Sequence, residues 1–341
     1  DALRARHSHK SDRPLVSLEQ ARANRLALDW SDYRPPRPAA SGVQVFAPYP
    51  IAELRPYIDW SPFFAAWEIR GRFPDLLAHP DSGEAARRLY DDAQQMLDKI
   101  EQEGWLTARA VTGFFPAYAE GDDIVVLDGE GAGERARIGQ LRQQGEHRDG
   151  VPHKSLADFV APRESGLTDY LGAFAVTAGI GLDEKVDEFR AALDDYNAIL
   201  LEALADRLAE ALAERLHERV RTELWGYSPE EKLDADGLLH ERYRGIRPAP
   251  GYPACPEHTA KEQLWELLDV ESAIGAQLTE SMAMWPSASV SGWYFSHPDA
   301  GYFVVGRVGQ DQVADYAARK GWDLPTAERW LSANLGYDPE D

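Results

Sequence analysis

Residues 183–223 read DEKVDEFRAALDDYNAILLEALADRLAEALAERLHERVRTE, the most periodic stretch of this 341-residue chain. Apolar residues recur in it at spacings of three and four, as one face of an α-helix requires. They are Phe189, Leu193, Tyr196, Leu200, Leu204, Leu208, Leu212 and Leu216. A helix over the whole segment would be about 60 Å long. Gly226 and Pro229 follow it, and both residue types commonly end helices. We therefore predict one long helix that crosses the domain as a spine.

The remaining chain alternates between helical and strand patterns without regular βαβ repeats, which favours an α+β fold. The patterns predict helices at 83–103, 261–268, 270–277, 313–320 and 326–335. They predict strands at 114–117, 122–127, 135–138, 156–160 and 170–176, and a hairpin of 289–295 with 302–308.

Local signals predict where some of these elements begin and turn. Ser17 and Gln20 have the spacing of a capping box at the start of a short helix. Ser61 precedes Pro62, which suits the first turn of a helix with Ser61 as its N-cap. Residues 129–133 read GEGAG and lack the spacing of a dinucleotide-binding loop, so we predict a hairpin turn there.

A second distinctive stretch, residues 244–258, reads RGIRPAPGYPACPEH. Its four prolines each fix φ and remove a backbone N–H, so neither a helix nor a central strand can form. The stretch predicts a stiff, extended loop that presents Arg247 and Tyr252 in a fixed arrangement. Such a loop can bind a small polar ligand, or it can simply connect two elements and cover a sheet.

The composition narrows the class of protein. Hydrophobic residues make up 44% of the chain, and ten Trp and fourteen Tyr favour a folded protein. Thirty-six basic and 58 acidic residues give a net charge of −22, which disfavours a nucleic-acid partner. No apolar run is long enough to span a bilayer, so we expect no membrane partner. A single cysteine, Cys255, fits a reducing compartment such as the cytoplasm.

Catalytic and metal-binding patterns are weak. Neither a Ser–His–Asp nor a Cys–His arrangement is apparent, so we assign no catalytic residue. Cys255 and His258 offer two zinc-type ligands without a second pair, so we assign no metal site.

The proline loop and several other motifs resemble one family. The motifs are YIDWSPFF (57–64), LADFVAP (156–162), LADRLAE (204–210), RPAPGYPACPEH (247–258), SVSGWYFSHPD (289–299) and the ending from ERWL (328–331) to NLGY (334–337). From about Val16 onward the chain resembles the C-terminal activation domain of cobalamin-dependent methionine synthase. The resemblance implies a curved, mostly antiparallel sheet with helices packed around it.

The resemblance also implies a function. Such a domain binds S-adenosylmethionine (AdoMet) and supports reductive methylation of oxidised cob(II)alamin to methylcobalamin, with an electron from flavodoxin or a similar reductase. Its partner is the cobalamin-binding domain of the same polypeptide. On this reading residues 1–38 are an interdomain linker and wrapping segment, and 39–341 are the AdoMet-binding domain. The chain begins Asp1-Ala-Leu-Arg, as we expect of part of a longer methyltransferase, and alone it should not turn over.

The resemblance carries AdoMet-binding roles to eight residues. Arg247 offers a guanidinium fork for the ligand carboxylate. Asp59, Glu241 and Glu210 are candidate partners for the ammonium and sulfonium.

The other four residues would meet the rest of the ligand. Ala249, Tyr302 and Phe303 fit contacts with adenine and ribose, although the two aromatic residues also suit an ordinary sheet core. Tyr252, five residues beyond Arg247, would line the path of the methyl group.

Two alternatives belong to other classes. The proline loop and acidic surface could serve a protein-interaction module without a small-molecule ligand. An independent AdoMet methyltransferase would need a strand followed by a glycine-rich loop near the N-terminus, and the sequence contains none.

Overall fold

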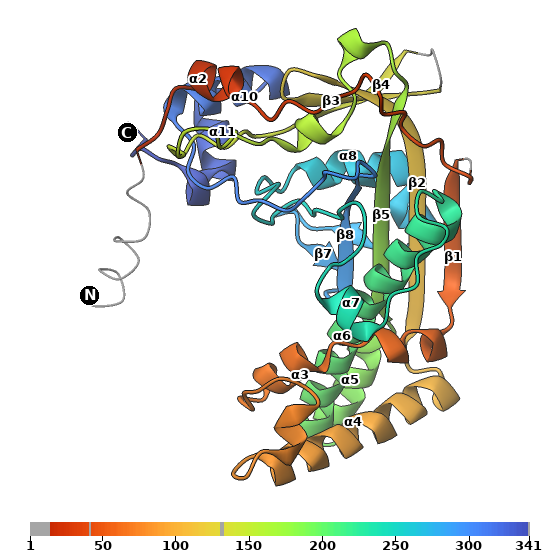
Figure 1. Ribbon diagram of the computed structural model, residues 1–341. Coiled ribbons are helices and arrows are strands. Elements are labelled where there is room, and N and C mark those ends of the chain that lie inside the picture. The colour runs from red at the N-terminus through yellow and green to blue at the C-terminus, as the bar shows by residue number, and fades with distance from the viewer. Residues whose placement is uncertain (1–13, 41, 130–132, 340–341) are drawn as a thin grey trace.

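A six-stranded antiparallel sheet forms the centre of the computed structural model, which describes residues 14–40, 42–129 and 133–339. Its strands are β1 (Val43–Tyr49), β2 (Thr107–Glu120), β3 (Asp123–Leu127), β4 (Glu134–Gly139), β5 (Asp169–Ile180) and β8 (Ser289–Tyr294). The order is β4-β3-β2-β5-β8, and β1 and β3 pair with opposite halves of one edge of β2. The sheet is open, and the α+β class is confirmed (Figure 1).

The two long strands are covered on both faces. Along β5, Phe174 and Val176 lie in one hydrophobic cluster, whereas Ala173 and Ala175 lie in another on the opposite face. All four are almost completely buried. Because side chains alternate along a strand, burial on both faces gives β5 its nearly continuous apolar sequence.

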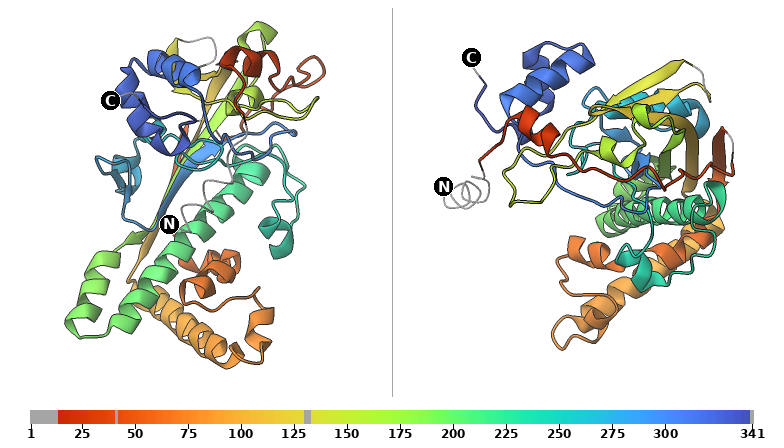
Figure 2. Two further views of the ribbon diagram at one scale, coloured as in Figure 1. Left: turned by 90° about the vertical axis from the view of Figure 1, so that its left-hand side faces the viewer. Right: turned by 45° about the horizontal axis from the view of Figure 1, so that its top comes forward.

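Helices α3 to α6 form the layer on one face. They are α3 (Trp60–Ala66), α4 (Gly83–Glu103), α5 (Leu182–Ala191) and α6 (Asp195–Arg219). The leucines of α6 pack on β5 and β8, so α6 is the expected spine, and Figure 2 shows it alongside the long strands. Helices α3, α4 and α5 gather at one end of the molecule (Figure 1).

The other face is covered by α8 (Ala260–Leu268) and α9 (Val270–Ile274). Helix α7 (Ala235–Leu239) lies in the connection from α6, and β6 (Gln277–Leu278) pairs with β7 (Met284–Trp285). At the end opposite α3 to α5, α10 (Gln310–Lys320) and α11 (Leu324–Trp330) form a smaller cluster near α2 (Leu18–Ala23) (Figure 1).

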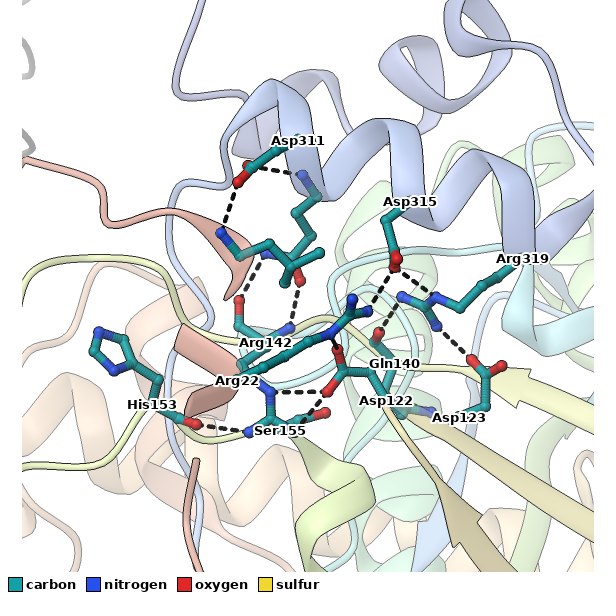
Figure 3. Close-up of polar contacts among 12 residues, drawn as sticks. Arg22, Asp122, Asp123, Gln140, Arg142, His153, Ser155, Asp311, Asp315 and Arg319 are labelled. Atoms are coloured by element: carbon teal, nitrogen blue, oxygen red, sulfur yellow. Dashed lines mark hydrogen bonds and ion pairs between the residues drawn. The ribbon is translucent and has the colours of Figure 1, made fainter. Parts of the chain in front are cut away.

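A polar network anchors the N-terminal segment to this end of the molecule (Figure 3). Arg22 on α2 binds Asp122 and Asp315, at 2.8 Å each. Asp122 also accepts from the buried Arg142, which reaches Asp158 at 2.8 Å. Ion pairs therefore join α2, the β2–β3 turn and α10, three parts of the chain that are distant in sequence.

The predicted 183–223 helix is wrong in one respect, because it is two helices. Helix α5 ends at Ala191, and α6 begins at Asp195 and continues through a π-helical turn, Val220–Leu224. At the break, Leu193 has φ 58° and is 91% exposed, and Asp194 caps α6 by accepting from the Asn197 N–H. The apolar period continues across a three-residue turn, so it did not reveal the reversal that lets α5 pack on α6.

The predicted hairpin of 289–295 with 302–308 is also wrong. The first half is β8, but 302–308 forms no strand, and its Val305 N–H donates to the Pro253 carbonyl. The proline loop takes the edge of β8 instead. Ile246 and Phe295 exchange two backbone hydrogen bonds of 3.1 and 3.0 Å, and the Trp293 N–H donates to the Pro248 carbonyl. Since those backbone groups are paired, 302–308 has no strand to join.

Four further details differ from the predictions. Residues 156–159 form a 3₁₀ turn instead of a strand, with the Ser155 N–H donating to the Asp158 carboxylate and the Asp158 N–H donating to the Ser155 carbonyl. Asp59, not Ser61, caps α3. Helix α9 ends before Gly275, and α11 ends at Trp330 before a short 3₁₀ turn.

The other predicted elements are present, although several are longer than predicted, such as β2 (predicted at 114–117) and β5 (predicted at 170–176). The helix at 83–103 has the predicted bounds, and Ser17 and Gln20 form both bonds of the capping box. Strands β3 and β4 pair as a hairpin, although 130–132 of its predicted turn lie outside the described residues.

Candidate functional site

A cavity of about 700 Å³ lies between α6, α3 and the segment that contains α7. Four of the eight predicted site residues line it together: Asp59, Glu210, Glu241 and Arg247. They come from four separate parts of the sequence, which the fold brings to one place. The volume is in the range of pockets that enclose a small molecule.

One face of α6 forms a wall of the cavity. Arg207, Glu210 and Glu214 line it, at positions i, i+3 and i+7 of the helix. The opposite side of α6 is the leucine stripe that packs on the sheet. The rigid packing of α6 therefore fixes where these three charged side chains stand.

Arg247 is held by several groups. Its Nη1 donates to the Glu214 carboxylate at 2.6 Å, and lies 3.4 Å from both His217 Nδ1 and the Tyr243 hydroxyl. Its backbone N–H donates to the Tyr302 hydroxyl at 3.0 Å. Burial alone would lower the pKa of Arg247, but the Glu214 charge outweighs it and the pKa is raised. The guanidinium is therefore permanently charged.

The other edge of this guanidinium is available to a ligand. Within the part of the chain that the structure describes, no group accepts a hydrogen bond from Nε or Nη2 of Arg247. Two parallel N–H groups of this kind match the two oxygens of a carboxylate.

Asp59 both caps helix α3 and lines the cavity. Its side chain accepts from the Ser61 N–H at 3.0 Å, which caps α3, and the residue is also part of the cavity wall. The neighbouring Ile58 and Trp60 are buried in the core and hold the Asp59 backbone in place. The interpretations as a helix-entry residue and as a cavity carboxylate are therefore compatible.

Glu241 follows α7 in a left-handed conformation, with φ 51°. Burial raises the pKa of its carboxyl, and the nearby Arg247 opposes that change. A positive charge that enters the cavity would therefore stabilise the ionised form of Glu241.

The cavity as a whole carries more negative than positive side chains. Six carboxylates line it: Asp59, Asp75, Glu210, Glu214, Asp236 and Glu241. Four arginines line it: Arg55, Arg72, Arg207 and Arg247. This balance suits a ligand with net positive charge that also carries one carboxylate.

Comparisons with known proteins identify the family of this chain. The family described as vitamin B12 dependent methionine synthase, activation domain, matches residues 50–321. The chain belongs to this family. A solved structure, the MetH reactivation domain bound to AdoHcy, is 54% identical, with a TM-score of 0.93. The match covers 95% of this chain and all of that one.

The other four predicted site residues of this activation domain lie outside the cavity wall. Tyr302 is 41% exposed beside Arg247, and Tyr252 is 59% exposed on the proline loop. The Ala249 carbonyl accepts from the Tyr252 N–H at 3.1 Å. Phe303 packs against hydrophobic core, 6.3 Å from the Phe159 ring centroid.

Sequence reasoning missed Glu214 and Tyr243, which both contact Arg247. Glu214 lies four residues after Glu210, so it shares a helix face with a residue that was chosen. That spacing could have identified it. Tyr243 lies four residues before Arg247 in an irregular segment, where no periodicity indicates a direction.

Neither a metal-binding cluster nor a membrane-spanning helix occurs in the described ranges 14–40, 42–129 and 133–339. No group of three or more His, Cys, Asp and Glu side chains there could hold a metal ion. No helix there is long and apolar enough to cross a membrane.

Proposed function

We propose that this activation domain binds AdoMet in the cavity beside Arg247 and serves to reactivate the cobalamin of methionine synthase. The observation that carries the proposal is the free Nε–Nη2 edge of Arg247 in a cavity with excess carboxylate. The MetH reactivation domain that is 54% identical to this chain was solved with AdoHcy, which is AdoMet without its transferable methyl group.

The charges of AdoMet match those of the cavity. Its carboxylate would bind the free edge of Arg247 through two charged hydrogen bonds. Its ammonium and sulfonium would lie among Asp59, Glu210 and Glu241, which line the same space. Cations removed from water need such partners, because unpaired buried charge is costly.

The adenosine would extend along the proline loop toward Ala249, Tyr302 and Phe303. Tyr302 is already fixed beside Arg247 by the 3.0 Å hydrogen bond to its backbone N–H. The exposed Tyr252 ring would stand beside the transferable methyl group.

We propose further that this surface docks on the cobalamin-binding domain of the same enzyme. The cobalamin-binding domain would supply the metal to which the methyl group is transferred. Exposed apolar side chains at the loop, Tyr252 and Val304, suit contact with another domain. Residues 1–38 would be the linker and wrapping segment, since Arg22 ties α2 to the domain.

The reaction also needs an electron, for which we propose flavodoxin or a similar reductase in the cytoplasm. The isolated domain should bind AdoMet without turning it over, because it contributes binding and orientation only.

Calorimetry with AdoMet tests the binding site. Arg247→Ala should weaken binding by about 2–4 kcal/mol, because a charge pair in a partly closed pocket loses a partner. Arg190→Ala is the matched control, since Arg190 is 53% exposed and pairs with Glu202 away from the cavity. Both variants should keep the wild-type circular dichroism spectrum. A wild-type domain that binds no AdoMet would instead favour the protein-interaction module.

A further inference from the structure

Glu214 lines the cavity and makes the closest contact with the Arg247 guanidinium. Its Oε2 lies 2.6 Å from Arg247 Nη1, and the two side chains are 15% and 19% exposed. Its Oε1 is buried and has no hydrogen-bond partner in the described structure. One oxygen of this carboxylate is therefore engaged by Arg247, and the other is buried.

Among the described residues, the side-chain contacts of the Arg247 guanidinium are all made by Nη1. Glu214, His217 and Tyr243 each approach Nη1. Glu214 and His217 are successive residues of one α6 face, so a rigid helix supplies two of the three. These contacts hold Nη1 in place and leave the Nε–Nη2 edge free to pair with a ligand.

Ring contacts with two tyrosines hold the His217 side chain in place. The His217 ring is fully buried and stacks on Tyr294 of β8, with ring centroids 5.1 Å apart. Its edge meets the Tyr243 ring at 4.9 Å. The group that faces Arg247 is thus fixed by both α6 and the sheet.

We propose that Glu214 is a positioning residue, which fixes the Arg247 guanidinium with its Nε–Nη2 edge toward the carboxylate of AdoMet. The inference rests on the proposed AdoMet site and adds a specificity role to it. Without Glu214, a flexible arginine side chain would lose rotamer freedom each time it bound the ligand. Glu214 would therefore favour ligands that carry a carboxylate.

Two ligands separate this role from direct contact. AdoMet and decarboxylated AdoMet share the ammonium, sulfonium and adenosine, and differ in the carboxylate. In calorimetry, Glu214→Gln should weaken AdoMet about tenfold, since a charged hydrogen bond that orients Arg247 is lost. The affinity for decarboxylated AdoMet should stay within about twofold of wild type. The control is Glu202→Gln, which lies on α6 like Glu214 and breaks an exposed ion pair with Arg190 of α5. It should change neither affinity.

The outcomes are distinct. Equal weakening of both ligands by Glu214→Gln would overturn the proposal, because it would indicate direct contact with the ammonium or a general structural loss. Unchanged affinity for both would overturn it as well. Failure of the underlying site would look different, since wild type would then show no preference for AdoMet over its decarboxylated form.

Discussion

Replacement of Arg142 by methionine tests how the network in Figure 3 stabilises the domain. The Arg142 side chain is 1% exposed and binds two carboxylates that are themselves buried, Asp122 (1% exposed) and Asp158 (5% exposed). Two hydrogen bonds of 2.8 Å join it to the two oxygens of Asp158, and Nη1 also donates to the His153 carbonyl at 2.7 Å. Methionine has a similar length and no charge.

The expected cost follows from what remains after the change. Asp122 keeps Arg22 and Asp158 keeps the Ser155 N–H, so neither carboxylate becomes completely unpaired. Breaking a buried pair typically costs 3–5 kcal/mol, so we expect a loss of about 3–4 kcal/mol. That is a large fraction of the roughly 5–15 kcal/mol by which domains are stable.

Urea unfolding followed by tryptophan fluorescence at pH 7 measures this loss. Arg163→Met is the control, because Arg163 is 66% exposed and its surface ion pair with Glu120 should contribute little to stability. The triple variant Arg142→Met, Asp122→Asn, Asp158→Asn should recover part of the stability, because no buried charge is left without its partner. A loss below about 1 kcal/mol for Arg142→Met would refute the reasoning, since it would mean that the buried carboxylates need no counter-charge.

Three further predictions concern the site and the sheet. Asp59→Asn should keep the α3 cap, because Asn caps helices as well as Asp does. It should weaken AdoMet more than AdoHcy if Asp59 faces the sulfonium, and both equally if it faces the ammonium; calorimetry that finds both affinities unchanged would remove Asp59 from the site. Burial raises the pKa of Asp169 to about 7, although hydrogen bonds from two backbone N–H groups act to lower it. The folded state therefore holds this proton more tightly than the unfolded chain, so its stabilisation is complete below about pH 4 and is lost as the pH rises through about 7. Asp169→Asn should flatten this decline in urea unfolding, and an unchanged pH profile would contradict the assignment. Without ligand, amide exchange should already be slow at Ile246, Gly251 and Cys255, whose N–H groups are bonded to backbone carbonyls; rapid exchange that slows only with AdoMet would show that the ligand orders the loop.

Local chemistry in the sequence was enough for many elements. The capping box at Ser17 and the bounds 83–103 depend on neighbouring residues, so they could be read without the fold. The α+β class and the long apolar face of α6 followed from periodicity in the same way. The family resemblance rested on motifs that the sequence contains in full, and the comparison with the activation-domain family agrees with it.

The tertiary structure decided what depends on partners distant in the chain. The edge of β8 was open to 302–308 or to the proline loop, and only backbone hydrogen bonds in the folded molecule determined that Ile246 and Pro248 occupy it. The break at Leu193 depends on α5 folding back on α6, which a periodic pattern does not encode. Glu214 has the same sequence character as the other acids of α6. It becomes the partner of Arg247 because the sheet and the loop place that guanidinium 2.6 Å away. Helix caps and apolar periods act over a few residues, whereas strand pairing and charge pairing depend on which distant segments the packed core brings together.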